Sequence, residues 1–310
     1  MKIHSQLFET FFYILIILTL FLTSDIHISS AQSFLVDKGS AELTAFPVEI
    51  YEVGDPIYIL ENQTNQRSAT NIEILLFPTD PQADIPWSCD TSSVADIECA
   101  FNAARSAENN QLGTSLPMLS LPNQSDWDDM SDGEKAIWLI NRERIDRGII
   151  PLHGLETNVT DVAQSFAQYL IDNNAFDHNA DGRSPWERLE DNPSIGVCHD
   201  FLNVAENIAV FWTNGSFIPL PTERSVYLWM YVDAGFAWGH RQAILWYPYN
   251  DNSGPMGKEG FLGIGRASGP HNGWNFAELI VMDVFDPCST WKYPSTNRIG
   301  LPWLIPLLLN

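Results

Sequence analysis

Apolar residues in this chain follow a helical period in its middle and strand-like runs toward both ends. The clearest helix is predicted over residues 159–171, where apolar side chains recur at three-four spacing. Residues 261–267 and 274–285 predict strands, and runs of Val, Ile, Tyr and Phe make residues 32–85 β-rich. Because helices and strands do not alternate, this order predicts an α+β layer fold and not a doubly wound parallel sheet.

Local signals place the other helices. A helical period begins near residue 94, and Ser131 with Glu134 forms a capping box for a helix that we expect to end at Gly148. Ser184-Pro185 marks a further start, with proline at the first helical position. Shorter helices are expected over 203–211, 222–233 and 238–246.

The N-terminal residues have the features of a secretory signal. Lys2 gives a small positive region, residues 11–22 are almost uniformly apolar, and small residues lead up to Ala31. The apolar run is too short for a good membrane span. We expect cleavage after Ala31 and a mature protein that is secreted or located at the cell surface or in the periplasm. An uncleaved anchor or a buried N-terminal helix is the alternative.

Four cysteines come after this signal, and their even number fits disulfide bonding in an exported protein. Four cysteines allow three pairings. We favour Cys89–Cys99 with Cys198–Cys288, because the first pair closes a short local loop. The chain has no CxxC motif, which argues against a zinc ribbon or a thioredoxin-type redox site.

The chain is strongly acidic, with 16 Lys and Arg against 39 Asp and Glu and a net charge of −23. Residues 1–31 carry one Lys and two acids, so the mature chain keeps a charge of −22. Nucleic acid and anionic membrane surfaces should repel such a protein, whereas cationic partners and divalent ions suit it. Solubility alone explains the charge at least as well.

Several standard catalytic and binding motifs are absent. The chain lacks GxSxG, HExxH and a phosphate-binding P-loop. Residues 177–182 resemble the start of an EF-hand calcium loop, but Arg188 stands where that loop needs a bidentate Glu. A turn that Asp and Asn side chains stabilise explains these residues more simply.

A set of short segments remains, and its order is more specific than any one member. The segments are Asn141-Arg142-Glu143-Arg144, Phe176-Asp177-His178 with Asp181-Gly182-Arg183-Ser184-Pro185, Ala205-Glu206-Asn207-Ile208-Ala209, Gly239-His240-Arg241-Gln242-Ala243-Ile244-Leu245, and Gly263-Ile264-Gly265. In this order they resemble the CAP superfamily, also called SCP domains, in its bacterial extracellular branch. The resemblance covers roughly half the chain. It implies an α-β-α sandwich with a central cleft, here with an N-terminal β-rich extension.

Together with the signal sequence and the composition shifts, the resemblance indicates five parts. We expect a signal peptide over 1–31, a β-rich segment over 32–85, a helical extension and linker over 86–129, the CAP-type domain over 130–290, and a C-terminal tail over 291–310. The β-rich segment is small for an independent domain, so it can instead pack on the rest of the chain.

In the CAP family, two His and two acidic residues line the cleft and can hold a divalent metal. Matched by motif, the resemblance assigns His178, Glu206 and His240 to this set. Imidazole nitrogen and carboxylate oxygen suit an ion such as zinc, with an open position for water. That these distant residues meet is implied by the resemblance alone.

The fourth ligand departs from the family pattern. Val232 occupies the expected acidic position, and Asp233 comes directly after it. In one continuous helix Asp233 and His240 would share a face. Gly235 and Gly239 argue against such continuity. Asp233 is therefore the candidate fourth ligand of a metal site that can be incomplete.

Each of these residues also has an ordinary structural explanation. His178 can be a surface residue in a turn, and His240 can be a hydrogen-bonded core residue. Glu206 can pair with Arg183 or Arg241. Histidines without motif support, which we expect to be exposed, are His199 and His271.

We expect a binding module more than an enzyme, with a cleft that holds a divalent metal, a lipid or a peptide. A metal-assisted hydrolase is the alternative, in which a carboxylate activates water; no nucleophile–base pair is visible for it. A third possibility is an acidic surface that captures a cationic partner. We expect no nucleic-acid partner and no transmembrane span in the mature chain.

Overall fold

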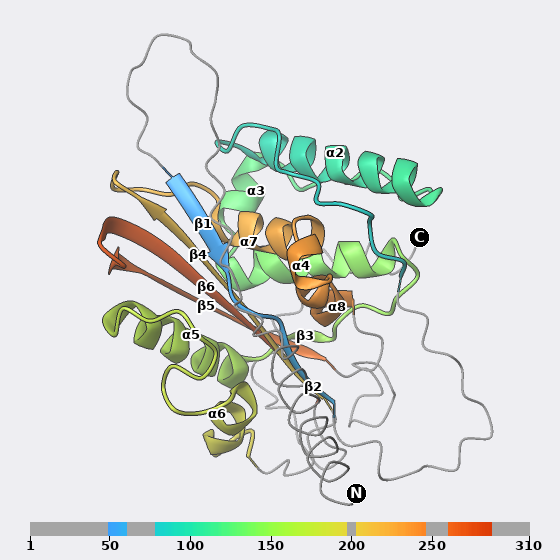
Figure 1. Cartoon of the computed structure of the whole chain (residues 1–310). Coiled ribbons are helices and arrows are strands. Elements are labelled where there is room, and N and C mark those ends of the chain that lie inside the picture. The colour runs from blue at the N-terminus through green and yellow to red at the C-terminus, as the bar shows by residue number, and fades with distance from the viewer. Residues whose placement is uncertain (1–48, 61–77, 197–202, 246–259, 287–310) are drawn as a thin grey trace, which may run out of the picture. The chain divides into compact units, whose positions relative to one another are not determined.

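The computed structural model describes residues 49–60, 78–196, 203–245 and 260–286 (Figure 1). The expected signal peptide, the C-terminal tail, Cys198, His199 and Cys288 lie outside the described residues. The elements are β1 (Glu49–Val53), β2 (Ile57–Leu60), α2 (Val94–Leu112), α3 (Gln124–Asp128), α4 (Asp132–Ile145), β3 (Gly154–Leu155), α5 (Thr157–Asp172), α6 (Pro185–Asp191), β4 (Asn203–Thr213), α7 (Pro221–Tyr231), the 3-10 helix η1 (Ala234–Phe236), α8 (Gly239–Leu245), β5 (Phe261–His271) and β6 (Trp274–Asp286).

A six-stranded mixed sheet forms the centre of the described fold. The strand order is β1-β4-β6-β5-β3, and β2 pairs with β4 further along the same edge as β1. β3 and β5 are parallel, and the other pairs are antiparallel. Helices combined with this mixed sheet confirm the expected α+β class.

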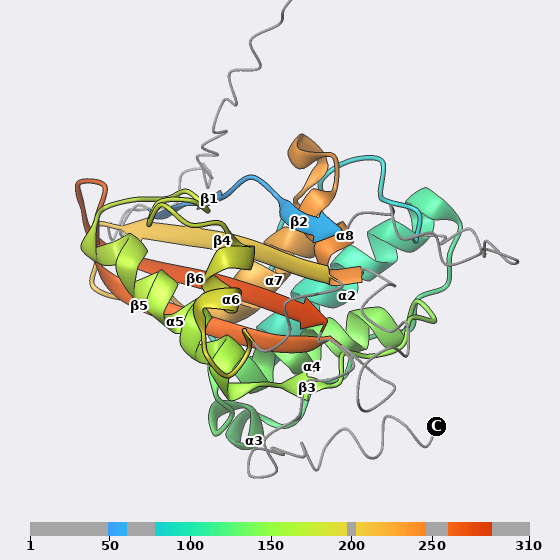
Figure 2. The same ribbon diagram turned by 90° about the horizontal axis from the view of Figure 1, so that it is seen from below.

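Helices cover both faces of the sheet (Figures 1 and 2). On one face α5 packs in a cluster with Ile208 and Val210 of β4. On the other face α4 and α7 share a cluster with Ala209 and Phe211. Successive residues of a strand point to opposite faces, so neighbouring residues of β4 serve different helical layers.

The helix start signals are present where the sequence predicts them. Ser131 and Glu134 form a reciprocal capping box at α4, and Ser184 and Glu187 form another at α6. α5 buries its apolar stripe as expected. α4 ends at Ile145, where Asp146 caps it, before the expected end at Gly148. Within the described ranges, every helix is too short or too polar to cross a membrane.

The prediction of a helix over 203–211 is wrong, because these residues form β4 inside the sheet. β4 pairs with β6 on one side and with β1 and β2 on the other. Since helices cover both of its faces, its apolar residues do not alternate with polar ones. A short run of this kind has no period that separates a buried strand from a buried helix.

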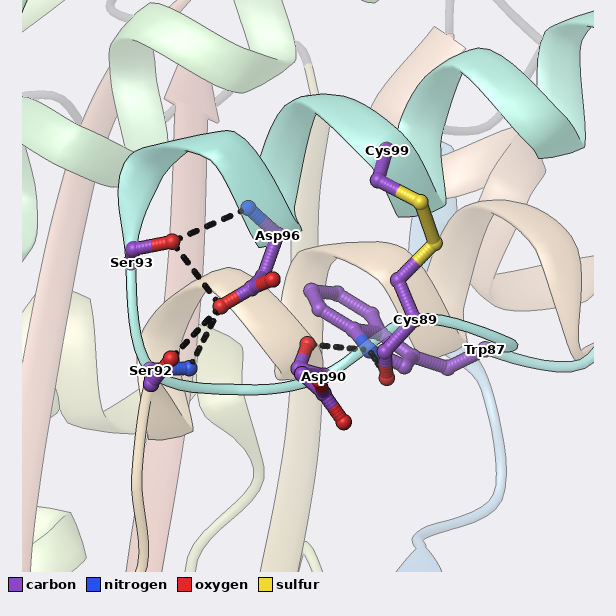
Figure 3. Close-up of a disulfide and its surroundings, with 7 residues drawn as sticks. All are labelled: Trp87, Cys89, Asp90, Ser92, Ser93, Asp96 and Cys99. Carbon is purple, nitrogen blue, oxygen red and sulfur yellow. Dashed lines mark hydrogen bonds between the residues drawn. A yellow bond between two sulfur atoms is a disulfide. The ribbon is translucent and has the colours of Figure 1, made fainter.

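The disulfide Cys89–Cys99 forms, as predicted, and joins the segment before α2 to the second turn of that helix (Figure 3). Trp87 donates from Nε1 to the Cys89 carbonyl at 2.9 Å. Ser93 caps α2 by accepting from the Asp96 N–H. The bridge and the cap fix the N-terminal end of α2.

Candidate functional site

His178 lies in the loop between α5 and α6, and it is buried with 3% of the residue exposed. Side-chain turns shape this loop: the Asn179 N–H donates to Asp177, and the Arg183 N–H donates to Asp181. Nδ1 of His178 lies 2.5 Å from Oε1 of Glu206 in β4. The turn expected in place of a calcium loop thus carries a buried histidine and not a surface one.

Arg188 of α6 holds the other side of Glu206. Its Nη2 donates to both carboxylate oxygens, at 2.8 and 2.6 Å. Its Nη1 donates to the His178 carbonyl at 2.8 Å, and its guanidinium lies 3.5 Å from the Phe166 ring centroid. The side chains of His178, Arg188 and Glu206 are all buried. One arginine therefore neutralises Glu206 and fixes the loop that carries His178.

His240 of α8 forms a second pair with Asp233. Nδ1 of His240 lies 2.6 Å from Oδ1 of Asp233, and the Arg241 N–H donates to the other carboxylate oxygen at 3.1 Å. No continuous helix joins the two residues: α7 ends at Tyr231, η1 intervenes, and α8 begins at Gly239. The glycines predict this break, and the turn brings Asp233 and His240 together all the same.

The two imidazoles meet at one short piece of chain between β1 and β2. Nε2 of His240 lies 2.6 Å from the Gly54 carbonyl oxygen, and Nε2 of His178 lies 2.5 Å from the Asp55 carbonyl oxygen. We call residues 49–60, which comprise β1, Gly54–Pro56 and β2, the strap. The strap runs antiparallel along β4, with β1 and β2 on either side of the imidazole contacts.

Each imidazole is placed between two hydrogen-bond acceptors. Nδ1 faces a carboxylate, and Nε2 faces a backbone carbonyl. A neutral imidazole has one N–H and one bare nitrogen, so it can donate only one of these bonds. Both bonds form together when the ring carries two protons.

These residues do not fit a metal ion while the strap is in place. Within the described ranges, no cluster of three or more His, Cys, Asp or Glu side chains is arranged to hold an ion. Both nitrogens of each imidazole already have a partner. Nδ1 is hydrogen-bonded to Glu206 or Asp233, and Nε2 is hydrogen-bonded to a carbonyl oxygen of the strap. The structure brings the four predicted ligands together as two His–carboxylate pairs, not as one set of four ligands.

Asp283 adds a second buried carboxyl to the site. It lies directly across from Glu206 in the β4–β6 ladder. Among the described residues no donor reaches either oxygen of Asp283. Burial, followed by the nearby charge of Glu206, raises the pKa of Asp283 well above its ordinary value. A protonated Asp283 can donate its O–H to Glu206, which is the hydrogen bond that two facing carboxyls need.

Sequence reasoning missed several residues of this site. Arg188 pairs with Glu206 in place of the expected Arg183 or Arg241. Arg183 pairs with Asp181 of its own loop and with Asp191 at the end of α6, and Arg241 pairs with Glu108. The position of Arg188, one helical turn after the Ser184-Pro185 helix start, was a usable signal, because it directs the side chain back toward the loop.

The expectation that His271 is exposed is wrong. His271 is buried, and its Nδ1 accepts a hydrogen bond from Nε1 of Trp212 at 2.9 Å. Burial lowers the pKa of His271, which keeps the ring neutral and able to accept that bond. His271 therefore has a structural role near the β5–β6 turn.

A hollow of about 360 Å³ lies away from the imidazole pair, between α5 and α6. Arg188 belongs to its wall and is the link between this hollow and Glu206. The hollow also contains Asp161, Asp181 and Asp191. The candidate site is the pair His178 and His240, because carboxylates hold these two imidazoles in a fixed orientation.

Comparisons of the chain with family models, with curated proteins and with solved structures find no match.

Proposed function

We propose that this chain is an exported, CAP-type binding module whose cleft holds a polypeptide backbone between His178 and His240. One observation carries the proposal: two oriented imidazoles aim Nε2 at two successive carbonyl oxygens of an extended segment. Helices on both faces of the sheet, and the pairing of the three motif residues with one another and with Asp233, support the CAP-type assignment. In this conformation the strap is the chain's own occupant of the cleft.

The surroundings of the imidazoles favour a peptide over a lipid. A strand that adds to the edge of a sheet is held mainly by backbone hydrogen bonds, as in other proteins that bind extended peptides. The strap pairs with β4 in this way from Glu49 to Leu60, and the pairing is interrupted between Gly54, whose N–H still donates to Ile208, and Ile57. The imidazole N–H groups donate to carbonyl oxygens, and every peptide supplies such oxygens.

The hydrogen bonds of Glu206 and Asp233 favour peptide binding over peptide hydrolysis. A general base needs an oxygen within reach of water or substrate. Glu206 accepts from His178 and from Arg188, and Asp233 accepts from His240 and the Arg241 N–H. Each carboxylate is thus already engaged in hydrogen bonds that orient an imidazole.

A fluorescent peptide with the sequence of residues 49–60 tests this proposal. The full chain with Gly54→Val is the receptor, because a side chain at Gly54 would collide with Ile208 and His178 and so keep the strap out. We expect fluorescence anisotropy to report binding. His178→Ala or His240→Ala in the same chain should weaken it by about tenfold or more.

Two outcomes of this titration would overturn the proposal: no binding by a folded Gly54→Val chain, or equal binding by the histidine variants. We call His178 and His240, together with the hydrogen bonds that they make to the strap, the clamp. If Gly54→Val does not fold, the clamp is tested within the native chain. The Gly54 N–H donates to the Ile208 carbonyl at 3.2 Å. His178→Ala and His240→Ala should speed its hydrogen exchange, and unchanged exchange would count equally against the clamp.

A divalent metal ion is the second candidate ligand, and one observation favours it. A carboxylate lies behind each imidazole at Nδ1, an arrangement that orients most metal-binding histidines. With the strap displaced, His178 and His240 would be the ligands. Calorimetric titration with Zn²⁺ should then detect binding to Gly54→Val that His240→Ala abolishes. Zinc binding of equal strength by the wild-type chain and the histidine variant would exclude this site.

A further inference from the structure

We infer that the cleft selects the tripeptide Gly-X-Pro within an extended partner segment, an inference that rests on the proposed peptide-binding function. The strap occupies the cleft with Gly54-Asp55-Pro56, and the walls treat these three positions differently. The first position has no room for a side chain, and the second leaves its side chain in solvent. The third position holds a proline ring that packs against Gly239.

The first position has no room for any Cβ atom. A Cβ at Gly54 would lie 2.4 Å from Cγ1 and 2.7 Å from Cδ1 of Ile208, and 3.2 Å from Nε2 of His178. Ile208 is fully buried in β4, and His178 is fixed by Glu206, so neither side chain can move away easily. Space therefore makes this position specific for glycine.

At the second position the cleft contacts only the backbone of the bound segment. The Asp55 carbonyl oxygen receives Nε2 of His178, whereas the residue itself is exposed. Its side chain points to no buried partner that the structure records. Any residue that keeps the extended conformation satisfies this position, and a proline at the next position favours that conformation.

The third position packs against a glycine, Gly239. A Cβ at Gly239 would lie 2.4 Å from Cγ and 2.5 Å from Cβ of Pro56, so the proline ring rests directly on the start of α8. His240, the next residue, donates to the Gly54 carbonyl. Proline has no N–H to add to the ladder and is accepted in edge strands at irregularities. The interruption between β1 and β2 is such a place.

The flanking residues of a partner would be read with little specificity. On one side Glu49–Val53 pairs with Ala209–Thr213, and on the other Ile57–Leu60 pairs with Asn203–Glu206. These are backbone ladders, which accept many sequences of good strand propensity. The inferred partner is therefore an extended polypeptide with Gly-X-Pro between two β-forming stretches.

Four peptides test the Gly-X-Pro motif separately from backbone binding by the clamp. The parent has the sequence of residues 49–60, and the variants replace its Gly by Ala, its Pro by Ala, or its central Asp by Asn. With the full Gly54→Val chain we expect the Gly variant to lose about tenfold or more in affinity through overpacking. The Pro variant should lose a smaller factor, and the Asp variant should stay within about twofold of the parent.

The results distinguish the two levels of the proposal. If all four peptides bind alike, the motif is overturned while the backbone clamp stands. If the folded receptor binds none of them, the proposed function fails with it. A loss confined to the Asp variant would also contradict the motif.

A matched pair of variants tests the proline position within the native chain. Gly239→Ala places a methyl against Pro56, whereas Gly235→Ala, in the neighbouring η1, meets nothing within 4 Å. We expect Gly239→Ala to speed hydrogen exchange at the Gly54 N–H by about tenfold or more and Gly235→Ala to leave it unchanged. Equal exchange in the two variants would overturn the proline subsite.

Discussion

At the scale of single residues, Asp283 is the group whose charge the site can least accommodate. It faces Glu206 across two strands, and burial followed by that carboxylate raises its pKa. Above the ordinary value of 3.8 the unfolded chain releases a proton that the folded chain keeps. This contribution to stability is therefore full below that value and is lost as the pH rises.

Asp283→Asn removes this titration and keeps the shape of the side chain. We expect the variant to lose less stability than the wild type between about pH 5 and pH 8, because an amide has no proton to release. Urea unfolding at the two pH values measures the difference. Asp191→Asn, at a side chain that is 62% exposed, is the control and should behave as wild type. Parallel curves for Asp283→Asn and wild type would show that Asp283 is ionised in the folded chain.

Arg188 and Arg183 give a second prediction, because they lie on the same loop–helix unit but differ in burial. Arg188→Met leaves Glu206 buried beside Asp283 without its cation and should cost about 3 to 5 kcal/mol in the free energy of unfolding. Arg183 has a side chain that is 47% exposed, so Arg183→Ala should change stability by about 0.5 kcal/mol or less. Denaturant unfolding compares them, and similar costs would contradict the role given to Arg188.

How far sequence reasoning reaches differs among these residues. The motifs predict His178, Glu206 and His240, and Asp233 was the candidate next to the family's acidic position. The structure joins these four residues in two pairs. Their orientation could not be derived, because hydrogen bonds to Gly54 and Asp55 connect positions more than a hundred residues apart. Nothing in the strap's own sequence indicates which wall its carbonyls face.

At the scale of elements, a buried ionic network ties three helices together. Arg105 of α2 lies 2.9 Å from Glu143 of α4, and Arg147 contacts both Glu143 and Glu108. Arg241 of α8 reaches Glu108 at 2.7 Å. Burial alone would raise the pKa of Glu143, but Arg105 and Arg147 outweigh it and hold that pKa at about 2.

The stability that Glu143 contributes is therefore present above its ordinary pKa of 4.5 and is lost as the pH falls toward 2. Glu143→Gln should destabilise the chain by about 3 to 5 kcal/mol at neutral pH, since two buried guanidiniums lose their anion. The difference from wild type should shrink by about pH 3. Unfolding curves at both pH values measure it, and a gap that is independent of pH would contradict the assignment.

Elements with a strong local signal were predictable, and β4 was not. α5 has one apolar stripe, and α4 and α6 begin with capping boxes, so local signals identify them. β4 is covered on both faces by helices and on both edges by strands. Its identity depends on partners distant in sequence, which no local period records.

At the scale of the whole molecule, the two sides of the clamp come from different helical layers. His178 comes after α5 and is fixed by α6 on one face, whereas His240 belongs to α8 on the other (Figure 2). They meet at the β4 edge because the strap passes there. Glu206 and Asn207 show the same division: Glu206 binds Arg188, and Asn207 donates to the His240 carbonyl. The edge of the sheet therefore couples both layers.

The charge of the whole chain makes a separate prediction about partners. The clamp holds a peptide through uncharged carbonyl oxygens, while the chain as a whole carries −23. Peptide binding through the clamp should thus depend little on salt, and lysines added to the peptide ends should add a salt-sensitive attraction to the surrounding surface. We expect the lysine-tailed peptide to bind Gly54→Val more tightly than the parent at about 0.01 M salt and equally at about 1 M, where screening is short-ranged. Anisotropy titrations at the two salt concentrations measure both terms, and a lysine effect that survives high salt would mean that the tails contact specific sites and not the general field.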